Sequence, residues 1–227
     1  PARCRIIDNT RRCKTNLMEK SYQKLGYFLI LLVPLTLVAF YKTYIGQFPN
    51  FEDKIDAFIH VHAFISAVWL FMLIAQPFLI YRKKLILHRT VGKLSYVIFP
   101  LLLLSFIPQI IKTIQHGNIN FLFFPLADSG LLITFYALAI YHRKERTKHM
   151  RYMIALSLVF LGPTVGRIGP IWLGWSELLT QNVQYGIIYS ILIALLFYDR
   201  SGNKTYNPYP IAMMCFMVHQ AIYYSVF

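Results

Sequence analysis

The chain is dominated by seven long apolar stretches that are separated by short polar connections. A helix needs about 20 mainly apolar residues to cross a bilayer, and in lipid every backbone polar group must be paired within its own segment. We therefore expect an all-α fold, a polytopic bundle of transmembrane helices with about seven spans. The expected spans are Leu25 to Ile45, Ala57 to Ile80, Leu94 to Ile114, Phe121 to Tyr141, Tyr152 to Leu173, Val183 to Tyr198 and Pro210 to Phe227.

The composition agrees with a chain that lies in a lipid bilayer. Hydrophobic residues make up 57% of the 227 residues and charged residues only 14%, which is too apolar for an ordinary soluble domain. The net charge of +14 would suggest nucleic-acid binding in a soluble protein, but here the basic residues lie between the apolar stretches. We interpret them as topology signals that contact anionic lipids at the cytoplasmic loops, and we expect no nucleic-acid partner.

The same basic residues predict the orientation of the chain, because lysine and arginine in short loops favour the cytoplasmic side. If the first stretch leaves the cytoplasm, only Lys42, Lys54 and Lys112 fall on the outer side. We therefore expect a cytoplasmic N-terminus. The residues on the cytoplasmic side are then Lys20, Lys24, Arg82, Lys83, Lys84, Arg89, Lys93, Arg143, Lys144, Arg146, Lys148, Arg151, Arg200 and Lys204.

The ends of the chain are expected to differ from the rest. Residues 1–17 are polar and basic and lack the apolar core of a signal peptide, whereas Met18 stands just before the first apolar stretch. We predict that 1–17 is a non-native or upstream extension and that 18–227 is a single transmembrane domain. The last apolar stretch runs to Phe227, which suggests truncation there. The three cysteines show no C-x-x-C spacing and predict neither a zinc site nor a redox motif.

Two charged residues inside the expected spans need a partner, because an ionisable side chain at membrane depth costs about 2.5 to 3.5 kcal/mol on insertion scales. Asp128 lies about 10 Å from the outer end of the fourth stretch, and Arg167 about 8 Å from the outer end of the fifth. An ion pair between them is feasible, since the two helices are consecutive and antiparallel. Such a pair can belong to a binding site or can simply hold two helices together.

Histidines extend this candidate site. His62 lies about 8 Å inside the second stretch, and His219 lies in the outer half of the seventh. Together with Asp128 and Arg167 they form a candidate binding cluster in the outer half of the membrane. His60 and His62 are about 200° apart around a helix, so at most one of them points to a common centre. The alternative is that each histidine only hydrogen-bonds a neighbouring carbonyl.

The fifth stretch is expected to be a broken helix. Pro163 and Pro170 each remove a backbone donor and should free the carbonyls of Val159 and Gly166. A broken helix with an ionisable residue at the break is a recurrent binding-site architecture in transporters. The alternative is that Gly162 and Gly166, a small-xxx-small pair, only allow close packing beside a proline kink.

A second set of histidines lies at the cytoplasmic edge. His88 precedes the third span, His142 ends the fourth, and His149 precedes the fifth. Imidazoles on neighbouring helices can ligate haem iron, or can bind anions alongside Arg89 and Arg143. Ordinary solvated loop histidines are the alternative.

Several polar residues between Ala57 and Pro210 form a recognisable pattern. They are His62, Gln76, Arg82, the loop H-R-T-V-G-K of 88–93, Tyr96, the K-H-M-R-Y of 148–152, Arg167 and the Y-D-R of 198–200. The pattern resembles a family of bacterial multi-pass membrane proteins with an H-R-x-x-G-[RK] loop and a domain of unknown function. The resemblance implies the multi-pass fold and a location in the bacterial cytoplasmic (inner) membrane. Lys93 replaces a common arginine, which keeps the charge but not its bidentate geometry.

The loop from His88 to Gly92 is also similar to the H-x-x-x-G that opens a helix in diheme b-type cytochromes. That similarity implies haem b as a cofactor, with His88 and His149 as iron ligands at the inner side. The outer pair of that family is not reproduced, since the fourth span offers Asp128 where a histidine would be needed.

Three kinds of function remain open from the sequence. The first is a redox protein that uses haem b and a quinone. The second is a proton-coupled transporter or another small-molecule carrier, with Asp128, Arg167 and His62 around the break in the fifth span. The third is a non-catalytic subunit or assembly factor that binds a membrane protein partner.

Overall fold

The computed structural model describes residues 22, 25–51, 55–201 and 207–227. The expected extension at 1–17 lies outside the described residues. Within them the chain is all-α, as predicted. The α-helices are α1 (Leu25–Ile30), α2 (Leu32–Tyr41), α3 (Ala57–Tyr81), α4 (Leu85–Leu104), α5 (Ile107–Gln115), α6 (Phe123–Tyr141), α7 (Arg146–Leu158), α8 (Leu161–Trp172), α9 (Glu177–Ser201) and α10 (Pro208–Val226).

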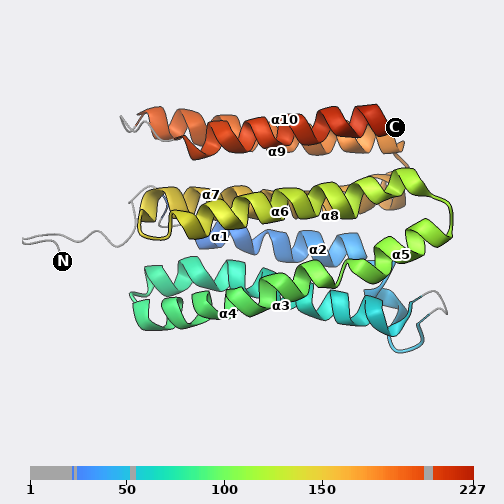
Figure 1. Ribbon diagram of the computed structural model, residues 1–227, viewed down its shortest axis with the longest axis horizontal. Helices are drawn as coiled ribbons and strands as arrows, with labels where there is room; N and C mark the ends of the chain where they lie inside the picture. Colours follow the sequence, from blue (N-terminus) through green and yellow to red (C-terminus); the bar gives the residue numbers. More distant parts are fainter. Residues whose placement is uncertain (1–21, 23–24, 52–54, 202–206) are drawn as a thin grey trace, which may run out of the picture.

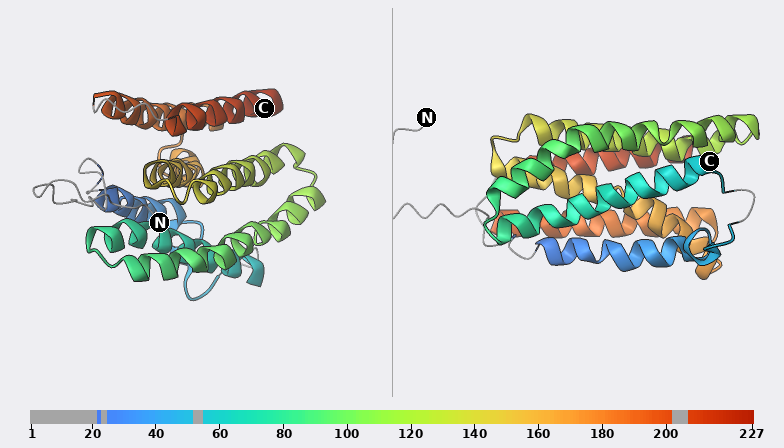
Figure 2. Two further views of the ribbon diagram at one scale, coloured as in Figure 1. Left: turned by 60° about the vertical axis from the view of Figure 1, so that its left-hand side comes forward. Right: turned by 90° about the horizontal axis from the view of Figure 1, so that it is seen from below.

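The helices lie along one common axis in three layers (Figure 1). Helices α9 and α10 form one outer layer, α6, α7 and α8 the middle layer, and α1 to α5 the other side, an arrangement that Figure 2 shows from two further directions. Helix α5 leads from the α3–α4 side towards α6. The bundle therefore has two ends, and successive connections alternate between them.

Basic residues gather at one of these ends, which we call the basic end. The connections α3–α4 and α6–α7 lie there and carry Arg82, Lys83, Arg143 and Lys144. The opposite end, which we call the far end, holds the connections α2–α3, α5–α6 and α8–α9. This alternation is the one that the charge pattern of the sequence predicts.

Three rods of the bundle are interrupted, α1–α2, α4–α5 and α7–α8, and the last two breaks lie close to a proline. Helix α4 ends before Ser105 and α5 begins at Ile107, where Pro108 in the first turn has no N–H to continue the preceding ladder. Helix α7 ends at Leu158 and α8 begins at Leu161, just before Pro163. Both breaks face the half of the bundle near the far end, where the polar side chains of the candidate site lie.

Five helical segments are long and apolar enough to cross a membrane, so the transmembrane character is confirmed. Helices α1 and α2 together form the helix of residues 25–41, which is apolar but shorter than these five segments. Helix α10 is not among the five. Large apolar side chains also cover much of the outside of the bundle, for example Phe64, Phe71 and Phe197. An outward apolar surface is what a bundle in lipid requires, because lipid tails and not water surround it. The five segments are residues 57–81, 85–115, 119–141, 146–172 and 177–200.

The bundle is held by one main core, which runs between the layers. Trp69 of α3 is 1% exposed and packs against Phe99 of α4, whose ring in turn stacks on Tyr136 of α6 at a centroid distance of 4.0 Å. A smaller aromatic cluster of Phe123, Tyr185 and Tyr223 closes the far end of α6, α9 and α10. Phe123 and Tyr185 of this second cluster pack against His219, a residue of the candidate site.

Candidate functional site

Asp128 of α6 contacts His219 of α10. The carboxylate Oδ1 lies 3.2 Å from His219 Nε2, and the side chains of Asp128 and His219 are 18% and 6% exposed. The Nε2–H direction does not align with the oxygen, so the contact is an ion-pair contact and not a well-formed hydrogen bond. Asp128 lies about 8 Å along α6 from its first residue, which places the pair in the far-end half of the bundle.

The other nitrogen of the same imidazole contacts a buried phenol. His219 Nδ1 lies 2.8 Å from the hydroxyl of Tyr185 in α9, and Tyr185 is 1% exposed. With the proton of the neutral ring on Nε2, that N–H lies on the Asp128 side of the ring without aligning with the carboxylate, while the Tyr185 hydroxyl donates to Nδ1. Three helices thus supply a chain of an acid, an imidazole and a phenol, each of which can carry or pass a proton.

A glycine of α8 brings its backbone next to this acid. A Cβ built on Gly162 would lie 3.6 and 3.7 Å from the two carboxylate oxygens of Asp128 and 3.5 Å from the Gln184 amide nitrogen. Gln184 is 4% exposed, and its Oε1 has no hydrogen-bond partner among the described residues. Asp128 therefore lies next to the start of α8 and near the buried amide of Gln184, whose oxygen can still accept a hydrogen bond.

Arg167 does not pair with Asp128. Its guanidinium donates to the carbonyl of Pro163 at 3.1 Å and lies over the ring of Phe40 in α2 at 4.3 Å. Gly162 and Arg167 are five residues apart on α8, about 140° around the helix, so they face different neighbours. Residue counting predicted matching depths for an ion pair, but Asp128 and Arg167 lie on different sides of α8.

His62 lies on the Arg167 side. Its Nδ1 is 2.8 Å from the hydroxyl of Ser105, in the break between α4 and α5, and its Nε2 is 3.4 Å from the hydroxyl of Ser66. The charge of Arg167 acts on His62, so the guanidinium and the imidazole lie in the same part of the bundle. His60, two residues earlier, turns away to the hydroxyl of Tyr44 at 2.7 Å. This divergence is the one that helical spacing predicts.

The predicted four-residue cluster is thus divided into two pairs at similar depth. Asp128 with His219 lies between α6, α9 and α10, and Arg167 with His62 lies between α2, α3 and α8. Helix α8 stands between the two pairs. Helix α8 is separated from α7 by the break before Leu161. A movement of α8 would therefore alter the surroundings of both pairs.

The break in the fifth span is present, but its carbonyls differ from the expectation. The carbonyl of Val159 is not free, because the N–H of Gly162 donates to it at 3.0 Å. The closest helix approach occurs at Gly169 and not at the predicted pair of Gly162 and Gly166. A Cβ on Gly169 would contact Thr180 of α9, with distances of 2.6 Å to Cγ2 and 3.0 Å to Cβ.

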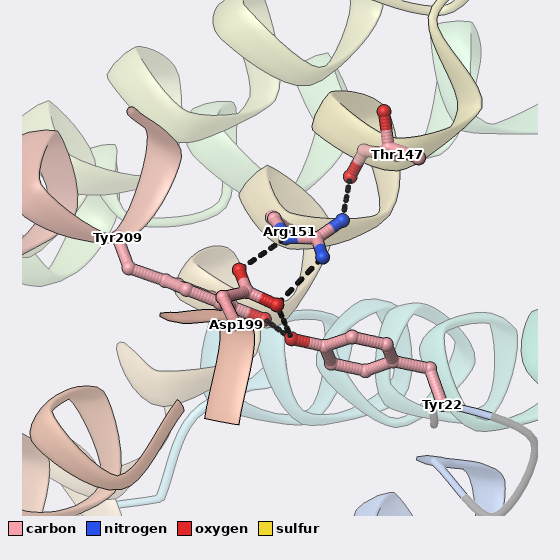
Figure 3. Close-up of polar contacts among 5 residues, drawn as sticks. All are labelled: Tyr22, Thr147, Arg151, Asp199 and Tyr209. Atoms are coloured by element: carbon pink, nitrogen blue, oxygen red, sulfur yellow. Dashed lines mark hydrogen bonds and ion pairs between the residues drawn. The ribbon is translucent and has the colours of Figure 1, made fainter. Parts of the chain in front are cut away.

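Near the basic end, an arginine and an aspartate form a buried pair that our sequence reasoning missed (Figure 3). Arg151 of α7 donates from Nε and Nη2 to the two carboxylate oxygens of Asp199 in α9, at 2.6 and 2.7 Å. The side chains are 0% and 5% exposed. The Tyr22 hydroxyl donates to Asp199 at 2.9 Å, and the Tyr209 hydroxyl donates to that of Tyr22 at 3.1 Å. The K-H-M-R-Y and Y-D-R motifs contain the two partners, but the charge pattern assigns Arg151 only to the basic residues of a cytoplasmic loop.

The histidines at the basic end also lie close to one another. His149 Nδ1 is 2.8 Å from the carbonyl of Ala139, and the charge of His149 acts on His88. His88 Nδ1 is buried and has no hydrogen-bond partner among the described residues. His142 instead contacts Glu145 at 2.9 Å. His142 therefore has its own acidic partner, and its side chain is 16% exposed.

The comparisons give no family for this chain. Searches against protein-family models, curated proteins and solved structures found no match. In the part of the chain that the structure describes, no group of three or more His, Cys, Asp or Glu side chains is placed to hold a metal ion. The functional argument therefore rests on the geometry of the polar groups alone.

Proposed function

We propose that this protein is a proton-linked carrier of small molecules in the bacterial cytoplasmic membrane. We also propose that the helix of residues 25–41 and α10 cross the bilayer, which brings the total to seven spans, with the N-terminus and the basic end in the cytoplasm. The observation that carries the proposal is the chain of Asp128, His219 and Tyr185 inside the bundle.

The chemistry of this chain is suited to the exchange of a proton. A buried carboxylate is costly in lipid, and it is stabilised either by a positive neighbour or by protonation. His219 can supply that neighbour as an imidazolium, or can remain neutral while Asp128 takes the proton. These two arrangements hold the same proton, on His219 or on Asp128, and the pair releases it by passing to a third state in which Asp128 is ionised and His219 is neutral. Intramembrane chains of acids and histidines are recurrent proton relays in pumps and transporters.

The position of the acid links proton exchange to a movable element. Gly162 places the backbone of α8 against the carboxylate, and the break after Leu158 separates α8 from α7. Discontinuous helices with an ionisable group at the interruption are typical of transporter binding sites. A change in the charge of Asp128 would therefore favour a different position of α8, which is the coupling that a carrier needs.

Transport can be tested with the purified chain in vesicles that contain a pH-sensitive dye. Organic acids, amino acids and sugars are added outside, one class at a time. We expect one class to change the internal pH, and we expect Asp128→Asn to abolish the response. Glu177→Gln removes an exposed carboxylate at the start of α9 and should leave it intact. An equal response in Asp128→Asn, or no response to any class from folded protein, would contradict the proposal.

Haem binding at the basic end is the second candidate. His149 would hold the iron through Nε2, because a hydrogen bond from Nδ1 to the Ala139 carbonyl leaves Nε2 available. His88 adds a buried nitrogen without a partner among the described residues. The two residues fit as ligands, and haem would supply one-electron chemistry there. A reduced-minus-oxidised visible spectrum, after expression with haem precursor, tests this. A b-type band that His88→Ala or His149→Ala removes would support it, and a featureless spectrum from folded protein would exclude it.

A further inference from the structure

We propose that Arg167 and His62 form a binding site for an oxyanion, a carboxylate or phosphate group that enters between α2, α3 and α8. The binding itself is independent of transport. The further statement that this anion is the carried substrate rests on the proton-linked function above.

The first argument is that Arg167 has no acidic partner among the described residues. A guanidinium has five N–H donors, and the carbonyl of Pro163 accepts from one of them. The ring of Phe40 covers one face of the group without neutralising its charge. A cation at this depth needs a counter-charge, since an isolated charge in a membrane span is costly.

The second argument is that the nearby acids are already engaged. Asp128 contacts His219, and no described acid at the depth of Arg167 remains for the guanidinium. Nearer the two ends, three described acids contact other cations, and the remaining one, Glu177 at the start of α9, is exposed. These other contacts are Asp56 with Lys112, Glu145 with Lys148, and Asp199 with Arg151. A counter-charge for Arg167 would then come from a bound anion.

The third argument is that a second cation lies on the route from the far end. Lys42 follows α2, donates to the carbonyl of Ile171 at 3.3 Å and lies over the ring of Trp172 at 4.2 Å. Ile171 is four residues beyond Arg167, or about 6 Å along α8. Lys42 is exposed and Arg167 is partly buried. An anion that enters between α2 and α8 from the far end would therefore meet Lys42 first and Arg167 deeper in the bundle.

His62 supplies the second polar group of the site. Ser105 donates its hydroxyl proton to the carbonyl of Leu102 at 2.6 Å, so its oxygen accepts from His62 Nδ1–H. His62 Nε2 keeps only the long 3.4 Å contact with Ser66. The imidazole is therefore held at Nδ1, and Nε2 donates to a bound oxyanion once it has also taken up a proton, which the negative charge of the anion favours. Arginine binds planar carboxylate and phosphate groups through two parallel hydrogen bonds, which defines the expected ligand class.

The test uses the full-length protein in nanodiscs of neutral phosphatidylcholine. The midpoint of thermal unfolding is measured while sodium phosphate or sodium acetate replaces sodium chloride at constant ionic strength. A second arm omits these anions and includes anionic phosphatidylglycerol in the disc. The variants are Arg167→Gln and Arg167→Lys, and Lys112→Gln is the control, because that far-end lysine already has Asp56 as its partner.

We expect a saturable rise of the midpoint with phosphate or acetate, unchanged in Lys112→Gln. In Arg167→Gln the half-saturating concentration should rise at least about tenfold, which equals about 1.4 kcal/mol. Protection by phosphatidylglycerol that depends on Arg167 would identify a lipid headgroup as the source of the oxyanion, and also supports the site.

No protection in either arm, or protection that Arg167→Gln leaves unchanged, would overturn the proposal. If Arg167→Gln does not fold, Arg167→Lys decides, because it keeps the charge and loses the two-pronged geometry. Equal half-saturation in Arg167→Lys and the natural protein would then overturn the proposal. Because binding is measured at equilibrium without transport, its failure leaves the proton test at Asp128 unaffected.

Discussion

At the scale of single residues, the role of a charge depends on the partner that the fold gives it. Arg151 adds to the basic count at one end of the bundle, yet it is completely buried and donates to both oxygens of Asp199. Tyr22 then connects the start of the chain to this pair, since its hydroxyl donates to Asp199 and its ring lies under the Arg151 guanidinium at 5.0 Å. The cluster in Figure 3 fixes α7, α9 and α10 at the basic end.

Breaking this pair should be severe. Asp199→Asn removes the carboxylate charge to which the buried Arg151 donates twice, and the removal of one partner of a buried ion pair costs about 3 to 5 kcal/mol. We expect a large fall in the thermal unfolding midpoint in detergent. Tyr22→Phe, which removes one hydrogen bond to the carboxylate, should cost about 1.5 to 3 kcal/mol. Equal midpoints for Asp199→Asn and the natural protein would show that the pair does not stabilise the fold.

The sequence identified the polar residues of the far-end half but could not pair them. Counting residues gives the depth of a side chain, so Asp128, Arg167, His62 and His219 were correctly placed at similar levels. Their neighbours depend on how each helix is rotated about its axis. That rotation is set by packing over the whole bundle, and nothing in the local pattern around Asp128 favours His219 over Arg167.

At the scale of elements, the fifth span shows how glycine position decides helix contact. The sequence predicted the break from its prolines, and α7 and α8 are separate helices. It also offered Gly162 and Gly166 as the packing pair. In the structure α8 approaches α9 most closely at Gly169, whereas Gly162 lies next to Asp128. Spacing alone could not choose among glycines that share one helix.

A pair of alanine substitutions tests this contact. Gly169→Ala would push a methyl group into Thr180 and should destabilise the protein by about 1 to 3 kcal/mol, as overpacking does. Gly166→Ala is the matched control, because the nearest atoms to its Cβ lie 3.9 and 4.0 Å away. Thermal unfolding of both variants gives the comparison. Equal effects at the two positions would mean that α8 and α9 do not approach most closely at Gly169.

The start of α3 provides a prediction of pH dependence. Asp56 caps α3 by accepting from Ile59 N–H at 3.1 Å and pairs with Lys112 at 2.7 Å. The hydrogen bond from Lys112, followed by that from the backbone, holds the pKa of Asp56 below its ordinary value. Its stabilising effect is therefore complete above the ordinary carboxyl pKa and is lost as pH falls through the lower, folded-state value.

Asp56→Asn isolates this effect, because asparagine can still cap the helix. The variant should be less stable than the natural protein at neutral pH, and the difference in unfolding midpoint should vanish on acidification. A difference that persists at the lowest pH would attribute the effect to something other than the charge of Asp56.

At the scale of the whole molecule, the alternation of charge between the two ends was predictable, while the number of spans was less so. Five segments meet the length and hydropathy that a span requires, and these include α9, whose helix begins well before the predicted Val183. The helix of residues 25–41 and α10 run along the same axis but do not meet both requirements. The helix of residues 25–41 falls short in length, and α10, which is long enough, falls short in mean hydropathy.

The proposed orientation predicts which loops reagents reach. In a background without the three native cysteines, one cysteine is placed at Lys144, at the basic end, or at Asn118, at the far end. A thiol reagent that does not cross membranes should label Asn118→Cys in intact cells and Lys144→Cys only after the membrane is opened. The reverse pattern would invert the topology, and labelling of both in intact cells would contradict a bundle that spans the bilayer.

The central claim is that Asp128 and His219 exchange a proton inside the membrane. Infrared difference spectra of the protein in nanodiscs, recorded between acidic and neutral pH, test it most directly. We predict a carboxylic acid band that appears on acidification, is absent in Asp128→Asn and shifts in His219→Gln, while Glu177→Gln retains it. A spectrum that Asp128→Asn leaves unchanged would show that this acid holds one protonation state throughout, and would contradict the proposed function.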